Sequence, residues 1–577
     1  MKKFKSYILV AMMGLSVASC KDFLTLMPLN EVVLENFWTN KDDVESVLMG
    51  AYAALETSDC VVRMSIWGEM RSDNIVGNST SNSGGANSSE SSGDDIIQIC
   101  KDNILQTNTY TTYKCFYDVI NRANTVLHFA PEVAAKDPNY TGAELKANEA
   151  EAIALRCLCY WYLIRAYKDV PYTTIPSIDD THDFFIGQTP FAQVLDSLIN
   201  DLDHVKNMAV NRYALESYNT GRFTRASIYA MLADLYLWKG DWDKCIECCE
   251  WVTARKLVEY EELLRKEGKN CTVELINNTY PLISETPTSA VCGNAYNEIF
   301  GKGNSFETLF ELPFDQDRNN PFVSSYYNSK NSKVGKLKAY TEIGNGFGTG
   351  SGNKVFIQPF DVRYYQNVRQ NGSDYGIVKY VFEKMEYNMS DGQIGDNRTF
   401  SDRQNTQPNW IVYRYTDVLL MEAEAKVMKA RSLGAGEEVA PQVKNLLEEA
   451  FNLVDAVNRR AICKDRYESA KELKLTDYNG SITTMEELVL DERRRELMFE
   501  GKRWFDLVRL AMREGDTKRV VQKVVYKHDA AQQSAVRIKL SDMNALFFPI
   551  NKDEIKINNK LVQNPVYEDD EYIEKAK

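Results

Sequence analysis

The sequence predicts a mainly α fold in which helical pairs form a scaffold that carries one large loop-rich insertion. Apolar residues recur at helical spacing in several neighbouring segments on both sides of this insertion. Residues 257–404 break that pattern and are instead rich in Gly, Asn, Ser and Tyr. Hydrophobic residues make up 44% of the 577-residue chain and aromatic residues 11%, which is ample for a buried core.

Helical pairs are expected over about residues 147–256 and again over about residues 405–515. Apolar side chains recur at helical spacing in these segments, and the first of them, Glu149–Tyr167, ends before Pro171. The segments expected as the first and third pairs are Glu149–Tyr167 with about Pro190–Asn207, and Trp410–Ala430 with Pro441–Ala461.

The second pair, Leu232–Val252, resembles a tetratricopeptide repeat, with Gly240-Asp241-Trp242 at its turn. In that register Cys245 takes the small position and Cys249 the aromatic position of the repeat. Both cysteines are therefore expected to be core spacers rather than redox or metal-binding residues.

The last expected helical pair, Leu488–Arg509, has the most distinctive sequence in the chain. Glu492 and Glu496 lie four residues apart with Arg493-Arg494-Arg495 between them, opposite an apolar stripe. Gly501 is expected to end the first helix in a left-handed conformation, and Trp504 to enter the core. The charges are expected on a solvated or inter-helix face, and a charged binding patch is the alternative.

Composition and motifs argue against several function classes. A net charge of −14 argues against a nucleic-acid partner, which requires a basic surface. The four histidines are scattered, so we expect no histidine-based metal site, and no cofactor is implied. The chain has no Gly-x-Ser-x-Gly or His-Glu-x-x-His motif, and we expect no enzyme.

The N-terminus predicts export. Lys2, Lys3 and Lys5 precede the apolar run Tyr7–Val17, which suits a secretory signal and is too short to span a bilayer. Val17-Ala18-Ser19-Cys20 resembles a bacterial lipobox, which implies removal of residues 1–19 and acylation of Cys20. A chance cysteine beside an ordinary cleavage site is the alternative.

Further segments at both ends of the chain carry a family resemblance. Together with the lipobox and the last helical pair, they are similar in order to the SusD/RagB family of Bacteroidetes outer-membrane nutrient-binding lipoproteins. The matching segments are Asp22-Phe23-Leu24, Pro28, Phe37-Trp38, Ala51–Leu55, Phe548-Pro549-Ile550, Glu554, Asn558, Leu561 and Gln563-Asn564-Pro565. The match is weakest in the insertion.

This resemblance implies a cell-surface lipoprotein for nutrient uptake and polysaccharide utilisation. Such a protein binds a glycan and delivers it to a TonB-dependent SusC-like transporter in the outer membrane, facing the outside. Residues 20–577 would form a single SusD-like domain whose tetratricopeptide-like pairs carry the ligand face. The alternatives are a peptide-binding RagB-type lipoprotein, a helical-repeat interaction scaffold, and a glycoside hydrolase.

Candidate ligand residues lie in and beside loops of the expected ligand face. Aromatic rings can stack on sugar rings, and planar polar groups can pair with hydroxyls. Packing within the protein is the competing interpretation for each residue. The candidates are Trp67, Arg71, Asp73, Asn74, Tyr110, Tyr326, Tyr327, Phe347 and Arg363.

Overall fold

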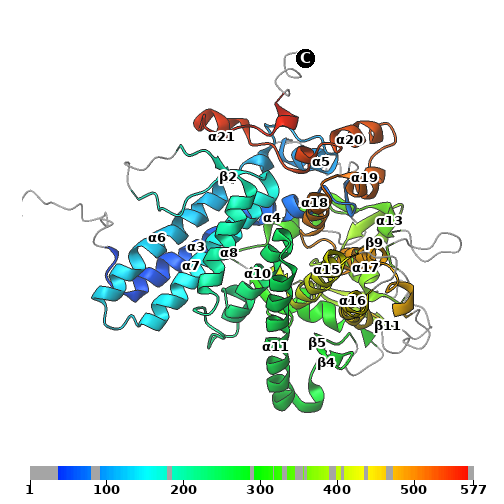
Figure 1. Cartoon of the computed structure of the whole chain (residues 1–577), viewed down its shortest axis with the longest axis horizontal. Helices are drawn as coiled ribbons and strands as arrows, with labels where there is room; N and C mark the ends of the chain where they lie inside the picture. Colours follow the sequence, from blue (N-terminus) through cyan, green and yellow to red (C-terminus); the bar gives the residue numbers. More distant parts are fainter. Residues whose placement is uncertain are drawn as a thin grey trace, which may run out of the picture.

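A computed structural model shows a chain built mostly of helices, with most of its small antiparallel sheets on the side opposite α3 and α6 (Figure 1). The predicted mainly α class is confirmed. The structure describes residues 37–78, 91–178, 185–285, 291–315, 317–327, 334–344, 355–356, 360–388, 398–403, 408–434, 440–462 and 472–568.

The helices nearest the N-terminus form a bundle. Asn40 begins its first helix with a capping box, in which its side chain accepts from the backbone of the first turn. α3 packs against α6, and α6 against α7, which is buried on nearly all sides. The helices are α3 (Lys41–Leu55), α4 (Ser58–Glu69), α6 (Lys114–Lys136) and α7 (Gly142–Tyr167).

The tetratricopeptide-like pair forms as predicted. Gly240 ends its first helix in the left-handed region, with φ 82°, where a side chain would be strained. Cys245 and Cys249 are fully buried in the second helix, which confirms their prediction as core spacers. The helices of this part are α8 (Phe191–Val205), α9 (Tyr218–Gly221), α10 (Arg225–Lys239) and α11 (Trp242–Glu267).

A second group of helices follows the insertion. α15 packs against α16, α17 and α11, and so joins the two helical groups. Three short helices then close the top of the molecule in Figure 1. The helices are α15 (Tyr415–Ser432), α16 (Pro441–Arg460), α17 (Ile482–Leu497), α18 (Arg503–Glu514), α19 (Lys518–Val524), α20 (Gln533–Lys539) and α21 (Lys552–Ile557).

The described part of the insertion contains short antiparallel strands as well as loops. One sheet has the order β1-β8-β10-β9 and a second β12-β11-β6. In addition, β7 inside the insertion pairs with β13, which follows the insertion, and we call this pair the clasp. The strands are β1 (Ile75–Gly77), β6 (Val291–Cys292), β7 (Thr308–Leu312), β8 (Leu337–Ala339), β9 (Val368–Asn371), β10 (Asp374–Ile377), β11 (Phe382–Asn388), β12 (Arg398–Asp402) and β13 (Trp410–Arg414).

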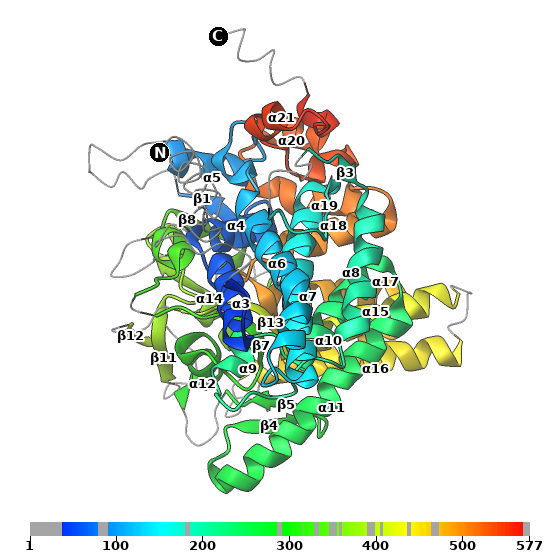
Figure 2. The same ribbon diagram turned by 90° about the vertical axis from the view of Figure 1, so that its left-hand side faces the viewer.

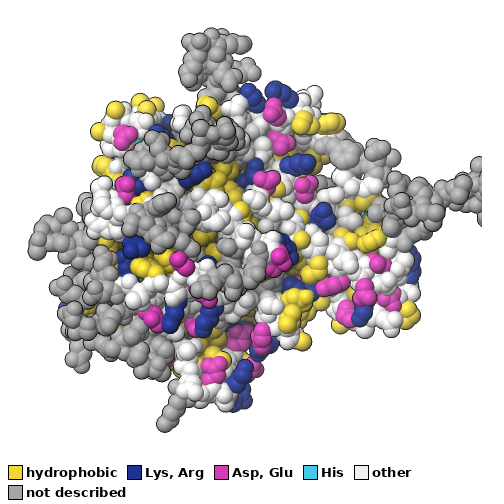
Figure 3. Space-filling view, turned by 180° about the vertical axis from the view of Figure 1, so that it is seen from behind, with side chains coloured by type: hydrophobic (Ala, Val, Ile, Leu, Met, Phe, Trp, Pro, Cys, Tyr) yellow, Lys and Arg dark blue, Asp and Glu magenta, His cyan; other side chains and the backbone are white. Residues whose placement is uncertain are grey.

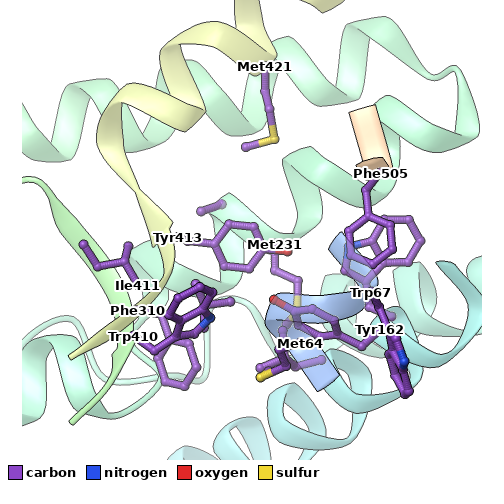
Figure 4. Close-up of a cluster of buried hydrophobic side chains, with 14 of the residues drawn as sticks. Met64, Trp67, Tyr162, Met231, Phe310, Trp410, Ile411, Tyr413, Met421 and Phe505 are labelled. Carbon is purple, nitrogen blue, oxygen red and sulfur yellow. The ribbon is translucent and has the colours of Figure 1, made fainter. Parts of the chain in front are cut away.

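One hydrophobic core joins the clasp to both helical groups. Figure 4 shows side chains from α4, α7, α10, α15, α18 and the β7–β13 pair converging on it. Trp67 and Trp410 are among the largest fully buried side chains. The labelled residues are Met64, Trp67, Tyr162, Met231, Phe310, Trp410, Ile411, Tyr413, Met421 and Phe505. The insertion is therefore anchored in the scaffold rather than appended to it.

The last helical pair differs in two respects from the sequence-based expectation. α17 ends at Leu497, and the turn uses two left-handed residues, Phe499 (φ 66°) and Gly501 (φ 73°). Trp504 is buried, as predicted. The charged side chains of this pair are buried between elements rather than solvated, because Arg493, Arg494 and Arg495 each pair with a carboxylate inside the fold.

Glu496 is the centre of this buried network. It accepts from Arg460 (2.5 Å), Arg414 (2.7 Å) and Arg363 (3.1 Å), which come from α16, the end of β13 and the insertion. Burial opposes ionisation of Glu496, but these three guanidinium groups together hold its pKa well below the ordinary value. The network thus ties the insertion to the helical scaffold through charge-assisted hydrogen bonds.

The described surface is mixed in charge. On the face in Figure 3, Lys and Arg side chains alternate with Asp and Glu side chains. None of the helices in the described ranges is long and apolar enough to cross a membrane.

Candidate functional site

Two of the predicted ligand residues, the half-buried Tyr326 and the 8%-exposed Tyr110, meet although 216 positions separate them in the sequence. Tyr110 lies in the short turn η2 (Thr109–Thr111), and Tyr326 in η5 (Val323–Tyr327). Their hydroxyl oxygens are 2.6 Å apart and share a hydrogen bond. Burial raises the pKa of Tyr110 far above its usual value, so that hydroxyl stays protonated. We call these two residues the tyrosine pair.

The turn that carries Tyr110 is held rigidly from below. Arg63, buried in α4, donates to the carbonyl oxygens of Thr112 (2.6 Å) and Thr109 (2.8 Å). The indole N–H of Trp67 donates to the carbonyl of Tyr110 at 2.9 Å. Three donors on one helix therefore fix the backbone beneath the tyrosine, and a fixed backbone lowers the ordering cost of binding.

The turn that carries Tyr326 is held from the other side. Its ring packs on Phe322, with ring centroids 5.2 Å apart. Gly335 approaches so closely that a Cβ there would lie 2.5 Å from the Tyr326 carbonyl oxygen. The exposed Lys336 places its ammonium 6.0 Å from the ring centroid. The ring is thus fixed beside a lysine whose long side chain allows its ammonium group to reach a ligand.

The pair lies where several chain segments converge. Strands β1 and β8 pair in antiparallel register, with Gly77 opposite Leu337, and helix α5 (Ser91–Cys100) contacts β1. Figure 2 shows α5, β1 and β8 together on the upper left of the molecule. The site therefore combines the N-terminal segment and the insertion, the two regions in which the sequence predicted ligand residues.

Four predicted residues near the end of α4 are core residues in the structure. Trp67, Arg71, Asp73 and Asn74 are all at most 1% exposed. The Arg71 guanidinium lies 4.3 Å from the Trp504 ring and donates to Asp102, Ala545 and Leu546. These side chains are therefore not available to a ligand here, and the correct interpretation is internal packing.

Asp73 and Asn74 connect α4 to the last helical pair. Asp73 accepts from Arg503 at 2.8 and 2.9 Å, and Arg494 lies 3.2 Å away. Asn74 accepts from Arg494 at 2.9 Å and donates to Glu69 at 2.9 Å. Both residues thus hold elements of the scaffold together.

Two predicted residues of the insertion are also internal. The Tyr327 hydroxyl donates to the Phe499 carbonyl at 3.2 Å, and the ring is fully buried. Arg363 is 4% exposed and pairs with Asp361, Glu492 and Glu496. Both therefore serve packing rather than ligand contact. Phe347 lies outside the described residues.

Sequence reasoning missed the residues that position the tyrosine pair. Arg63 and Lys336 stand in no motif, and each acts on a neighbour that is distant in sequence. A signal for Arg63 was present, because it lies on the same helix as Trp67 and one turn before it.

Two family models match the chain. One is described as the SusD family and matches residues 306–567. The other is described as "Starch-binding associating with outer membrane" and matches residues 22–237. Together they cover most of both helical groups, except α11, and much of the insertion.

Relatives and solved structures agree with these models. "SusD-like protein P38" and "SusD-like protein P25" of Formosa agariphila are 25% and 24% identical, and each alignment covers 88% of this chain and 92% or 90% of the relative. A SusD superfamily protein from Bacteroides vulgatus has a TM-score of 0.62 at 17% identity, over 92% of this chain and all of that one. Surface glycan-binding protein A from Bacteroides thetaiotaomicron, solved with laminarihexaose, has a TM-score of 0.57 at 19% identity, over 91% of this chain and all of that one.

Proposed function

Since the chain belongs to the SusD family, we propose that it is a cell-surface lipoprotein that binds a glycan and delivers it to a TonB-dependent SusC-like transporter. The ligand would be an oligo- or polysaccharide. The protein would act by binding alone, without a chemical step.

The tyrosine pair is the observation that supports glycan binding most directly. Two phenol rings are brought together from distant segments, and their hydroxyls share a hydrogen bond. Rings fixed in this way can take the apolar face of a sugar, while Lys336 and the hydroxyls meet its oxygens. The structural neighbour with bound laminarihexaose supports a glycan over a peptide as the ligand.

Attachment to the outer membrane is proposed through Cys20, which lies outside the described residues. Cleavage after residue 19 would leave this cysteine as an acylated N-terminus. Each buried CH₂ contributes about 0.8 kcal/mol, so several acyl chains anchor a protein stably. The description of the second family model, which mentions the outer membrane, supports this location.

We propose that different parts of the chain form the scaffold and the ligand surface. Residues 20–577 would form one domain, in which helical repeats at about 147–256 and 405–515 carry the insertion at about 257–404. Tyr326 is the described ligand candidate within that insertion, and Tyr110 adds to it from outside. The ligand surface is thus proposed at the border of the insertion rather than inside it.

The test is affinity electrophoresis of soluble protein lacking residues 1–20, in gels that contain one polysaccharide each. Retardation by at least one polymer is expected, with no release of reducing ends. Tyr326→Ala should weaken retention by about 1–3 kcal/mol in binding free energy, the usual cost of losing an aromatic anchor. Tyr326→Phe keeps the ring and should lose less.

Tyr526→Ala is the matched control, because that tyrosine is 59% exposed and lies outside the tyrosine pair. It should migrate like the unmodified protein. Unchanged retention of Tyr326→Ala would remove the pair from the site. Release of reducing ends, or retention by short peptides and by no glycan, would refute the proposed function itself.

A further inference from the structure

A cavity of about 410 Å³ opens far from the tyrosine pair, between α9, α10, the second half of α11 and the loop before β7. In Figures 1 and 2, α11 lies at the lower end of the molecule and α5 at the upper end, and Figure 2 shows β1 and β8 close to α5. We propose that this cavity is a second ligand site, for a neutral saccharide of one or two sugar units. The choice of a saccharide rests on the proposed function.

The charges that line the cavity cancel, which selects the class of ligand. Three cations face three anions: Arg212, Lys256 and Lys266 against Glu216, Glu259 and Glu262. At its rim, Arg212 pairs with Glu216 at 2.6 Å and with Glu262 at 3.3 Å. A ligand with a net charge gains little from such a lining, whereas a neutral ligand pays no penalty for it.

The floor of the cavity is fixed by buried polar groups. The Thr220 hydroxyl donates to the Asn304 side-chain oxygen at 2.5 Å, and the Asn304 backbone N–H donates to Glu311 at 2.6 Å. Asn304 is left-handed, with φ 49°, and the fully buried Glu311 holds it there. The loop that presents Ser305 and Phe306 is therefore set before any ligand arrives.

Phe306 supplies an apolar surface for the sugar ring. Its side chain is half-buried, and the Lys256 ammonium lies 4.8 Å from the ring centroid. Lys256 also donates to the Phe306 carbonyl at 2.7 Å, so backbone and ring are both held. One fixed aromatic ring beside hydroxyl and amide groups is the combination that suits a sugar, whose faces are apolar and whose edges are polar.

The rim of the cavity adds a polar side chain that can hydrogen-bond to a ligand. Asn211 is an exposed amide that faces the cavity from the loop before α9. The cavity volume falls in the range of small-molecule sites, of about 300–1,000 Å³, and toward its lower end. A site of this size accommodates the end of a chain or a short product rather than a polymer.

The test uses soluble protein carrying Tyr326→Ala, so that the tyrosine pair does not contribute. Cellobiose, laminaribiose and lactose are titrated by calorimetry and by saturation-transfer NMR, with glucuronate as a charged comparator. At least one neutral disaccharide should bind, and more tightly than glucuronate. Adding Phe306→Ala should weaken that binding about tenfold, as for loss of an aromatic contact.

Two further variants separate binding from folding. Asn211→Ala removes an exposed rim amide and should weaken the same disaccharide about threefold to tenfold, the usual net value of a hydrogen bond. Leu264→Ala changes an exposed side chain of α11 beside the cavity and should leave affinity unchanged.

Three results would overturn the second site: no neutral disaccharide binds, glucuronate binds at least as tightly, or neither Phe306→Ala nor Asn211→Ala alters affinity. These results are distinct from failure of the proposed function, which is read from polymer retention by the unmodified protein. If the unmodified protein is retained by a polymer but the Tyr326→Ala protein binds no disaccharide, the second site is refuted and the proposed function is not.

Discussion

Replacing Asp73 by asparagine should lower the free energy of unfolding of the protein without selectively abolishing ligand binding. The carboxylate is 1% exposed and accepts from Arg503 at 2.8 and 2.9 Å, with Arg494 at 3.2 Å. Burial opposes its ionisation, but the two guanidinium groups hold its pKa well below the ordinary value. An amide of the same shape removes the negative charge that pairs with both buried arginines. Breaking buried pairs of this kind costs about 3–5 kcal/mol.

Urea unfolding followed by intrinsic fluorescence measures this loss, and affinity electrophoresis of the folded protein measures binding. Asp553→Asn is the matched control, because Asp553 pairs with Lys556 at 2.9 Å but both side chains are largely exposed. Surface pairs contribute about 0–1 kcal/mol, so its urea midpoint should hardly move. A normal midpoint for Asp73→Asn together with lost ligand retention would refute the structural role assigned to Asp73.

Three further predictions concern stability. Trp504→Ala should lower the free energy of unfolding by about 3–5 kcal/mol, as for other buried aromatics, and selective loss of ligand at an unchanged melting temperature would contradict it. Gly68→Ala should cost about 1–3 kcal/mol, because a Cβ there would lie 1.7 Å from the Gly501 carbonyl oxygen, whereas Gly142→Ala meets nothing within 4 Å and should be silent. Burial raises the pKa of Glu311 from 4.5 to about 7, so the folded state holds a proton that the unfolded state has lost, and stability should fall by up to about 3 kcal/mol as pH rises from about 4.5 through 7. Glu311→Gln should flatten that part of the curve of urea midpoint against pH, and an unchanged slope would show that Glu311 does not titrate there.

The helical scaffold could be predicted because its signals are local. Apolar spacing over α10 and α11, with Gly240 between them, is read from a few dozen neighbouring residues. The strands of the insertion could not be predicted because most are two to five residues long, which is too short for an alternation of apolar and polar residues to show. The end of α17 was misplaced because Phe499, not only Gly501, takes a left-handed conformation there.

The ligand candidates were harder because burial depends on distant partners. Arg71 and Asp73 look like loop residues in sequence, yet their partners lie 420 or more positions away in Leu546 and Arg494. Residue chemistry alone identifies Tyr110 and Tyr326 as candidates, and no local sequence pattern shows that they meet. Residue type identifies what can bind, but long-range packing decides which side chains stay at the surface.

The contacts of α4 with the last helical pair also constrain the order of folding. Asp73 finds Arg503 only after 430 further residues have been added, and Arg71 finds Leu546 only after 475. Contacts of such high sequence separation form late and slow a folding reaction. The packing around α4 is therefore completed only after the last helical pair has joined the fold.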